Sequence, residues 1–541
     1  MLLRSIMKKV FAVLLLVLIA MTVLVACGSG ESKQYAYDED GHWNISSDEF
    51  EQKGYKRHNY KFSICTDCGW NENFNMLKFE KSKGGKSYEI VGRTYNYKFR
   101  DSDTYTNILD GIPEYYNGLP IVKVSALYDS TFYDNKKLII PKSVKEIGYN
   151  AFKGCTGIKE IVITNAATIG TTAFSSINTL QKVTLGKGIT QLGNYAFSEC
   201  ENLESINIPE DFTALPIGTF FKCTSLKDIA GGDNIKEIGE LAFFGCSALE
   251  KITIPQGVSK IDDQTFKGCS SLKEIVIPDS VTEIGYRAFK ECQSLTDVSI
   301  PDSVTLIEES AFEDCTGLTA VKLPKNLTQL NAHIFAGCSS LERVSIPNSV
   351  KDIDTGVFKD CTSLASITIP MGLTSIDLSL FKNCSALTSV FLPDSVVWLG
   401  SYVFQDCVNL HEVRFSDNIT SISSEAFKNC YRLTDLTLPK NLKSIDTAAF
   451  KNCKNLKSVF IPKTVTTIGT QAFSLDLTSD SFTRIYSLEN IYFGGNSEEW
   501  AKVEWKQKDD YSSIISFYSE TEPTTAGNFW HYVNGKPAAW N

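Results

Sequence analysis

The sequence lacks an excess of basic residues. It has 53 lysines and arginines against 63 aspartates and glutamates, which gives a net charge of −10 at pH 7 and a pI near 5.3. The two signs are interleaved along the chain, so no cluster of Lys and Arg offers the charge density that binding to a phosphate backbone requires. We therefore expect no nucleic-acid partner, and no attraction of the folded protein to anionic membranes by charge alone.

Motifs of common catalytic sites are also missing. The chain has no Gly-x-Ser-x-Gly and no His-Glu-x-x-His sequence, which are typical of serine hydrolases and zinc hydrolases. Residues 85–87 end like a phosphate-binding loop, but Glu80 stands where that motif needs its leading glycine. Only five histidines are present, and His333 and His411 lie in separate segments with no nucleophile at a suitable spacing. The sequence predicts that the protein is not an enzyme.

Long apolar runs are absent except at the N-terminus. Residues 10–26 form an almost unbroken apolar run, and Arg4, Lys8 and Lys9 precede it. A charged start followed by an apolar core is typical of an export signal. The run ends in Leu-Val-Ala-Cys, which resembles a bacterial lipobox. This resemblance implies cleavage immediately before Cys27 and acylation of its thiol.

The alternative for this segment is an uncleaved membrane helix. A run of 17 residues is short for that purpose, because a span needs about 20 apolar residues. We therefore expect residues 1–26 to be a lipoprotein signal peptide. The protein would then be held by lipid on the extracellular face of a bacterial membrane, since more than one acyl chain gives a stable anchor.

A phenylalanine recurs at a fixed period through the body of the chain. Fifteen copies are 23 residues apart, except that the first interval is 22. The positions are Phe152, Phe174, Phe197, Phe220, Phe243, Phe266, Phe289, Phe312, Phe335, Phe358, Phe381, Phe404, Phe427, Phe450 and Phe473. A period of this length is typical of solenoid proteins, in which each repeat forms one coil of a continuous stack.

The copy that ends at Phe289 indicates what each position does. Ile275 and Ile277 alternate with outward positions, which predicts a short strand with one buried face. Pro278 ends this strand, because proline has no N–H for a ladder. Gly285 allows a tight bend, and Phe289 fills the interior. No copy can bury its apolar groups alone, so neighbouring copies must stack strand on strand at about 4.8 Å.

The repeat, written Cys-x-x-Leu-x-x-Ile-x-Ile-Pro-x-x-Val-x-x-Ile-Gly-x-x-Ala-Phe, resembles the 23-residue leucine-rich repeats of BspA-like bacterial surface antigens. The resemblance covers roughly residues 119–495. Residues 117–122, and residues 488–495 with Trp500, are similar to the opening and closing segments of that family. The resemblance implies a β-rich solenoid, built as a right-handed leucine-rich-repeat coil stack, and a cell-surface role in adhesion or host binding without a catalytic site.

We expect a solenoid of about 15 repeats with a small N-terminal module and a C-terminal cap, because the open ends of a solenoid need cover. The expected segments are a signal peptide at 1–26, a tether and small Cys/His module at 27–85, the N-terminal opening and cap of the solenoid at 86–140, the leucine-rich-repeat solenoid at 141–495, and a C-terminal cap and tail at 496–541.

Most of the 16 cysteines belong to the repeat. Thirteen of them, from Cys155 to Cys453, follow a repeat phenylalanine by three residues, and Ile177 and Asp476 take this place in the other two copies. Many cysteines in an exported protein suggest disulfides. Neighbours in register would be about 4.8 Å apart, however, whereas the Cβ atoms of a disulfide prefer about 3.8 Å. We expect buried free thiols.

A small segment without the period precedes the solenoid. It contains His42, His58 and the pair Cys65 and Cys68 in a Cys-x-x-Cys sequence. Two histidines and two thiolates can provide the four ligands of a structural zinc ion. A Cys65–Cys68 disulfide is an equally good alternative, and packed free thiols are a third. A module of fewer than about 60 residues needs a staple of this kind. We expect no other cofactor.

Exposed strand positions are where leucine-rich repeats usually bind ligands. The position between the two buried strand residues is mostly small and polar, but toward the C-terminus it reads Phe391, Arg414 and Phe460. His411 and Arg343 occupy other exposed strand positions. Aromatic residues with arginine are common anchors of protein interfaces. We expect these residues to bind an extracellular protein. The alternatives are that a loop or the C-terminal tail covers the aromatic residues, or that strand propensity alone placed them.

Two further features suggest other interpretations. Residues 474–487 form an insertion that breaks the period, and loops inserted in solenoids often carry function. Exposed tryptophans at 500, 505, 530 and 540 would indicate binding of a glycan or cell wall, whereas buried ones would indicate packing in the cap. A featureless strand face would suit a structural surface spacer.

Overall fold

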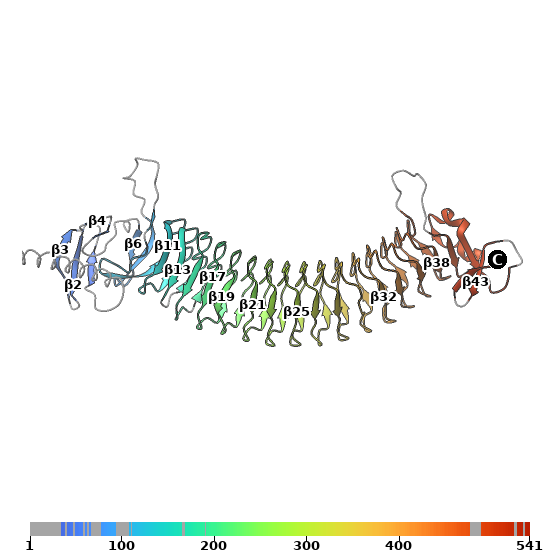
Figure 1. Ribbon diagram of the computed structural model, residues 1–541, viewed down its shortest axis with the longest axis horizontal. Helices are drawn as coiled ribbons and strands as arrows, with labels where there is room; N and C mark the ends of the chain where they lie inside the picture. The colour runs from blue at the N-terminus through green and yellow to red at the C-terminus, as the bar shows by residue number, and fades with distance from the viewer. Residues whose placement is uncertain are drawn as a thin grey trace, which may run out of the picture. The chain divides into compact units, whose positions relative to one another are not determined.

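The structure is a computed structural model that describes residues 77–93, 111–164, 168–189, 191–475, 488–523, 527–533 and 536–540, apart from the side chains of 133–135, 435 and 536. The backbone alone is described for five short strands between residues 34 and 65 and for Ile108–Leu109. The chain divides into two compact units, Met1–Gly232 and Asp233–Asn541. Each unit contains a stack of coils whose strands succeed one another along the chain (Figure 1).

Each regular coil contains one longer strand and one two-residue strand. In the coil that ends at Phe289, these are β23 (Glu274–Val276) and β24 (Glu283–Ile284). The longer strand ends before Pro278, as expected for a residue that cannot donate to a ladder. Both strands pair in parallel and in register with the preceding coil, β23 with β21 (Lys251–Thr253) and β24 with β22 (Lys260–Ile261). The expected β-rich solenoid is confirmed.

The first unit begins with small antiparallel elements. These are a three-stranded sheet of β1 (Gln34–Tyr37), β2 (Gly41–Ser46) and β3 (Glu49–Arg57), and a hairpin of β4 (Tyr60–Lys61) and β5 (Ile64–Cys65). A hairpin of β6 (Leu77–Lys81) and β7 (Tyr88–Arg93) follows, and the boundary expected at residue 85 lies inside it. Since β7 pairs in parallel with β10 (Leu119–Val124), this hairpin opens the stack.

The coils of the first unit form two ladders. The short strands after β10 are β12 (Glu146–Ile147), β14 (Thr168–Ile169), β16 (Gln191–Leu192) and β18 (Ala214–Leu215), and β9 (Tyr115–Tyr116) pairs with β10. The longer strands are β8 (Ile108–Leu109), β11 (Thr131–Ile140), β13 (Thr156–Ile163), β15 (Lys182–Leu185), β17 (Ser205–Ile208) and β19 (Asp228–Gly231).

The second unit continues the same pattern. Its further longer strands are β25 (Asp297–Ser299), β27 (Ala320–Lys322), β29 (Arg343–Ser345), β32 (Ser389–Phe391), β34 (Glu412–Arg414), β36 (Asp435–Thr437), β38 (Ser458–Ile461), β40 (Asn490–Phe493) and β42 (Ile515–Tyr518). Its other short strands are β20 (Glu237–Ile238), β26 (Leu306–Ile307), β28 (Gln329–Leu330), β30 (Asp352–Ile353), β31 (Ser375–Ile376), β33 (Trp398–Leu399), β35 (Ser421–Ile422), β37 (Ser444–Ile445), β39 (Thr467–Ile468) and β41 (Glu504–Trp505).

Stacked phenylalanines fill the interior of both units. In the second unit, ring centroids of successive repeat phenylalanines from Phe243 to Phe473 lie 5.1–6.0 Å apart with nearly parallel planes. All of these rings are buried. Because each ring contacts the rings before and after it, a single coil has no complete core of its own, as expected for a solenoid.

The repeat cysteines form a second interior ladder. All thirteen are free and buried, which confirms the expected core thiols. The Cys269 thiol donates a hydrogen bond to the carbonyl oxygen of Phe243 in the preceding coil, 3.2 Å away, and Cys292 bonds Phe266 in the same way at 3.3 Å. The thiol therefore donates to a buried carbonyl group. An alanine at this position would remove that donor.

Glycine at the repeat bend has a different role from the one expected. Gly285 does not have a positive φ; the nearby residues in the left-handed region are Arg287 (φ 54°) and Glu291 (φ 65°). A Cβ atom at Gly285 would lie 2.9 Å from the backbone carbon of Asp262 in the preceding coil. The glycine is therefore required by the close approach of two coils rather than by a sharp bend.

An aromatic cap closes the C-terminal end. Trp505 in β41 contacts the last repeat ring, Phe473, at 6.2 Å and stacks on Tyr511 at 4.5 Å. Trp500, in helix α2 (Ser497–Ala501), is also buried, and a short 3₁₀ helix spans Lys508–Ile514. The strand ladder continues through β42 and β43 (Phe529–Val533) and ends in the antiparallel edge strand β44 (Lys536–Ala539), which contains Pro537.

Candidate binding surface

The longer strands of the second unit present an exposed face, which we call the long-strand face. It consists of the outward residues of the longer strands from β21 to β40. The middle residues of these strands point inward; Val298, Val390 and Val413 are examples. The third residue of each strand points outward, as the alternation predicted. Most of these outward residues are small or polar, so a large apolar side chain among them is an exception.

Phe391 is such an exception. Its side chain is 52% exposed, and its Cα atom pairs with that of Arg414 in the next coil. Arg414 is exposed, and its guanidinium makes no hydrogen bond or ion pair with the described residues. His411 is exposed one residue before β34, and its backbone N–H bonds the carbonyl oxygen of Thr388, 3.0 Å away. Phe391 and Arg414 therefore lie side by side, and His411 lies three residues before Arg414 in the same coil. We call these three residues the Phe391 patch.

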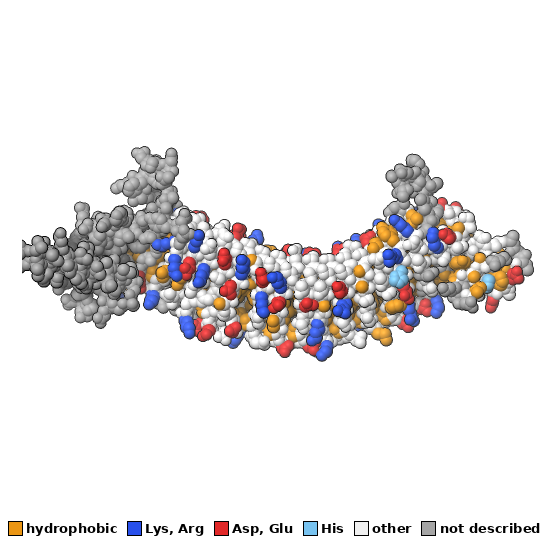
Figure 2. Space-filling view, viewed as in Figure 1, with side chains coloured by type: hydrophobic (Ala, Val, Ile, Leu, Met, Phe, Trp, Pro, Cys, Tyr) orange, Lys and Arg blue, Asp and Glu red, His pale blue; other side chains and the backbone are white. Residues whose placement is uncertain are grey.

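Some other charged residues on or beside the long-strand face are paired between neighbouring coils. Lys251 bonds Glu274 at 3.1 Å, and Lys457 bonds Glu489 at 2.9 Å. Such pairs satisfy exposed charges locally. The unpaired guanidinium beside Phe391 is therefore free to bind a carboxylate of another molecule, as arginines at protein interfaces do. Figure 2 shows basic and apolar side chains near one another toward the C-terminal end of the second unit.

Arg343 lies apart from the Phe391 patch. It is exposed in β29, and its guanidinium also makes no ion pair within the described residues. The coil between β29 and β32 presents only Ala365, Ser366 and Thr368 at the corresponding outward positions. Arg343 thus lies two coils before the strand that carries Phe391, with one whole coil in between. It can contribute to that patch only for a ligand that spans this distance.

The expectation that Phe460 is an exposed anchor is wrong. Its side chain is half-buried in β38, and its ring contacts Trp530 at 5.3 Å and Tyr532 at 6.3 Å. Trp530 is fully buried, and its indole N–H donates to the carbonyl oxygen of Phe493, 2.8 Å away. The C-terminal strand β43 therefore covers Phe460, which was the alternative that the sequence left open.

The tryptophans of the C-terminal segment belong to the cap. Trp500, Trp505 and Trp530 are 7% exposed or less. Trp540 is half-buried, and its ring lies 3.8 Å from that of His531. Buried indoles cannot stack on a sugar, so the interpretation of these residues as a glycan platform is not supported.

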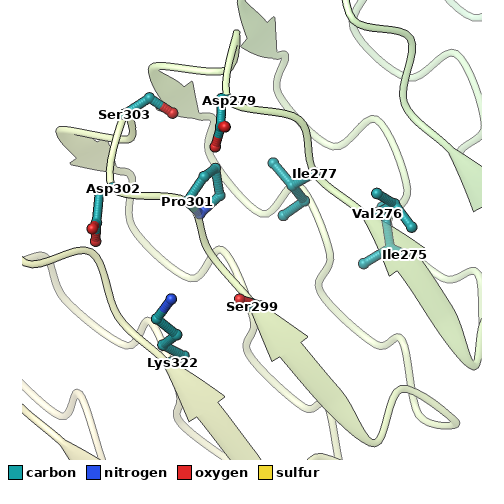
Figure 3. A pocket seen from close by; sticks show the side chains of 9 residues that line it. All are labelled: Ile275, Val276, Ile277, Asp279, Ser299, Pro301, Asp302, Ser303 and Lys322. Carbon is teal, nitrogen blue, oxygen red and sulfur yellow. The ribbon is translucent and has the colours of Figure 1, made fainter.

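A shallow groove of about 640 Å³ crosses three coils N-terminal to the patch (Figure 3). Val276, Ser299 and Lys322 line it from successive strands, and Asp279 and Asp302 lie at its edge. Asp302 is paired with Lys325 at 3.2 Å, and hydrogen bonds from Lys325 lower the pKa of its carboxyl. A carboxylate that is held ionised by an ion pair is a poor general acid.

Several predicted residues lie outside the described part of the chain. Cys27, His58 and Cys68 are among them, and for His42 in β2 and Cys65 in β5 only the backbone is described. The inserted segment is described only up to residue 475. Acylation and the zinc or disulfide staple stay predictions. Among the residues with described side chains, no three His, Cys, Asp or Glu groups are placed to share a metal ion. No helix of the described residues is long and apolar enough to cross a bilayer.

Sequence reasoning missed one exposed residue. Trp398, in the short strand β33, is 46% exposed. The corresponding residue is serine in β31, β35 and β37 and aspartate in β30. The change from serine or aspartate to tryptophan at this position of the repeat is the sequence signal for Trp398.

The repeat region matches a known protein family. The family model of the BspA-type leucine-rich-repeat region, which contains six copies, matches residues 125–250, 236–365 and 356–479. A search of curated proteins gives no match. The matched residues cover more than half of the chain.

Several solved structures are similar in fold. A leucine-rich cell surface protein from Faecalibacterium prausnitzii is 23% identical, with a TM-score of 0.39, and the match covers 79% of this chain and 96% of that one. A leucine-rich-repeat protein from Bacteroides ovatus is 21% identical, with a TM-score of 0.39 and coverage of 82% and 97%. The pneumococcal vaccine antigen PcpA is 18% identical, with a TM-score of 0.38 and coverage of 82% and 96%. Together with the family match, the stacked coils show that the chain belongs to the BspA-type leucine-rich-repeat family.

Proposed function

We propose that this protein is displayed on a bacterial cell surface and binds another protein through the Phe391 patch. The observation that carries this proposal is the exposed Phe391 ring beside the unpaired guanidinium of Arg414. An aromatic side chain and an arginine, when both are desolvated in a complex, supply most of the binding free energy in many interfaces. The paired strands fix the backbone positions of both residues before binding, which lowers part of the entropy cost.

The charged residues of the Phe391 patch indicate the kind of partner surface that would fit it. Arg414 provides a bidentate donor for a carboxylate, and His411 adds a second donor at the same edge. The coil on the N-terminal side offers small uncharged residues, Ala365, Ser366 and Thr368. We therefore propose a partner surface with an acidic side chain next to an apolar pocket or knob that contacts Phe391.

Attachment to the cell is the second part of the proposal. The N-terminal signal and the lipobox-like sequence support acylation of Cys27. Lipid attachment would present the solenoid outside the cell, where adhesion to a host, to matrix or to another bacterium takes place. Metabolic labelling with an alkyne fatty acid tests this point. The label should be incorporated into the full chain and lost in a Cys27→Ala variant; labelling that persists in the variant would contradict it.

Binding of the purified full chain to arrays of matrix proteins, host-cell surfaces and glycans tests the recognition role. The variant Phe391→Ser with Arg414→Ser should lose at least about 2 kcal/mol of affinity for the protein ligand, roughly 30-fold. The matched control is Val276→Ser with Lys322→Ser, which removes an exposed apolar residue and a cation from the same long-strand face. Equal loss in both variants, or in neither, would contradict a site at the Phe391 patch.

The N-terminal module is proposed to hold a structural zinc ion through His42, His58, Cys65 and Cys68, with a Cys65–Cys68 disulfide as the alternative. Two histidines and two thiolates suit tetrahedral zinc. Metal analysis of the purified chain should find one zinc per molecule, and a Cys68→Ser variant should lose it. A chain that contains no zinc, and that is two thiols short of the number expected for a fully reduced protein, would instead indicate the disulfide.

A further inference from the structure

A second group of exposed apolar side chains lies in the short strand β33 and in the segments that flank β31 and β33. Met371 is 81% exposed, Leu378 40%, Val397 50% and Trp398 46%. All four belong to two neighbouring coils, and we call them the Trp398 patch. An exposed apolar cluster of this kind on a soluble protein marks an interaction site more often than chance.

Backbone pairing joins the two coils that carry these residues. Trp398 in β33 is the Cα partner of Ser375 in β31, and the Val397 N–H donates to the carbonyl oxygen of Thr374, 2.9 Å away. Gly400 follows in the same coil, where an added Cβ atom would lie 2.6 Å from the backbone nitrogen of Leu378. The two coils thus touch at Leu378, and glycine at 400 adds no side chain that could cover the indole.

Carboxylates lie on the N-terminal side of this patch. Asp352, Asp354 and Asp377 occupy outward positions of β30 and of the turns after β30 and β31. Burial raises the pKa of the Asp377 carboxyl, and the negative charges of Asp352 and Asp354 raise it further, against a hydrogen bond from Ser375. Asp377 is therefore close enough to Asp352 and Asp354 to sense their charges.

Among the residues whose side chains are described, no cation neutralises these carboxylates. None of the three aspartates makes an ion pair with the described residues, although the solenoid pairs many of its other charges. The adjacent Lys351 donates instead to the carbonyl oxygen of Asn348, 3.2 Å away. An exposed indole therefore lies beside uncompensated negative charge. A ligand cation would be attracted both by the face of the ring and by the carboxylates.

We propose that the Trp398 patch binds a basic segment of another polypeptide. A lysine or arginine side chain of that segment would lie over the Trp398 ring, with its charged group directed toward Asp377 and Asp352. Its aliphatic part would contact Val397 and Met371, because long basic side chains pack their methylene groups on apolar surface. This site is separate from the Phe391 patch, which faces outward from the longer strand and carries the opposite charge.

The test uses the purified full chain and a fluorescently labelled peptide of alternating arginine and glycine. Fluorescence anisotropy should show saturable binding that weakens as salt rises, because exposed charges are screened. A peptide with glutamate in place of arginine should not bind. Trp398→Ala should weaken binding roughly tenfold, and the double variant Asp352→Asn with Asp377→Asn should weaken it by a similar factor while leaving the indole in place.

Three outcomes would overturn the proposal. One is unchanged affinity in Trp398→Ala at an unchanged melting temperature. Another is equal binding of the arginine and glutamate peptides. The third is binding of neutral oligosaccharides that depends on Trp398, without binding of the basic peptide, which would indicate a glycan site. The variant Phe391→Ser with Arg414→Ser should bind the basic peptide normally, so that failure of this proposal and failure of the proposed function are distinguishable.

Discussion

Two stretches of the second unit, the coils of residues 251–345 and the coils of residues 366–414, can be compared position by position. Their interiors match. The rings of Phe266 and Phe289 lie 5.4 Å apart, and those of Phe381 and Phe404 lie 5.5 Å apart. In both stretches the repeat cysteine is buried and donates to the phenylalanine carbonyl of the preceding coil.

The exteriors of the same coils differ. The first stretch presents mostly small residues and ion pairs between coils, such as Lys273 with Glu250 at 2.9 Å; the exposed Val276 and the unpaired Arg343 are exceptions. The second presents Phe391, Trp398 and Met371 to solvent, next to charges that have no partner. The difference teaches that the interior specifies the coil and leaves the outward positions free to vary. Substitutions in the interior should therefore change the stability of both stretches alike. Substitutions on the surface should change ligand binding in the second stretch only.

The largest expected effect is alkaline unfolding of both stretches together. Burial raises the pKa of Cys269 to about 12 and that of Cys315 to about 12, whereas an unfolded thiol has a pKa near 8.5. The stabilisation from the neutral thiols is complete below about pH 8.5 and is lost as the pH rises toward about 12, at about 1.4 kcal/mol per thiol per pH unit. Urea unfolding at pH 7, 9 and 10, followed by circular dichroism, measures this. Equal stability at pH 7 and pH 10 would contradict the buried ladder.

The next effect is loss of one ring from the phenylalanine ladder. Phe266→Ala and Phe381→Ala should each destabilise the protein by about 3–5 kcal/mol, because each removes a fully buried aromatic side chain and leaves a cavity. Thermal and urea unfolding of the two variants should give similar values. A difference of more than about 2 kcal/mol between them would break the equivalence of the two interiors, and a stable variant would mean that the ring is not a core residue.

A smaller effect is expected from the glycines at coil contacts. An added Cβ atom would lie 2.9 Å from backbone at Gly285, and 2.6 Å from backbone at Gly400. Gly285→Ala and Gly400→Ala should each cost about 1–3 kcal/mol, as overpacking does. Because Gly400 lies beside Trp398, its variant should also reduce binding of the basic peptide, whereas the Gly285 variant should not. If both variants bind the basic peptide equally well, the contact between coils at Gly400 does not affect the Trp398 patch.

The smallest effect concerns surface ion pairs. Lys273 and Glu250 are more than half exposed, and a pair of this kind contributes about 0–1 kcal/mol. Lys273→Met should therefore change the free energy of unfolding by less than about 1 kcal/mol, and Arg414→Met should do the same. The two variants should differ only in ligand binding, which Arg414→Met weakens. If Lys273→Met and Arg414→Met bind the protein ligand equally well, then paired and unpaired cations do not differ in function.

Much of the fold followed from the period of the sequence. The spacing of the phenylalanines indicated the coil, Pro278 indicated the end of its strand, and Cys269 and its equivalents indicated a ladder of free thiols. These inferences succeeded because each coil contacts only its neighbours, so a local pattern determines most contacts. The role of Gly285 was misjudged, since the approach of an adjacent backbone cannot be read from one copy.

The surface was harder to predict. Exposure of Phe391 followed from strand alternation, but the cover over Phe460 comes from Trp530, 70 residues later in a segment without the period. No local pattern gives that contact. Arg343 was grouped with Phe391 as a candidate ligand contact, yet one whole coil lies between their strands. Trp398 was missed because the short strands have two residues each, too few to suggest a face by themselves.

Pro537 in the last strand has a consequence for assembly. A ladder of identical parallel strands offers a free edge to which another chain could add, and repeated addition would produce fibres. In an edge strand, proline is tolerated where its nitrogen faces away from its partner, so β44 presents an outer edge that lacks one donor. The antiparallel return of this strand also breaks the register that an incoming coil would need. The C-terminal strand therefore offers an incoming coil a poor template for pairing.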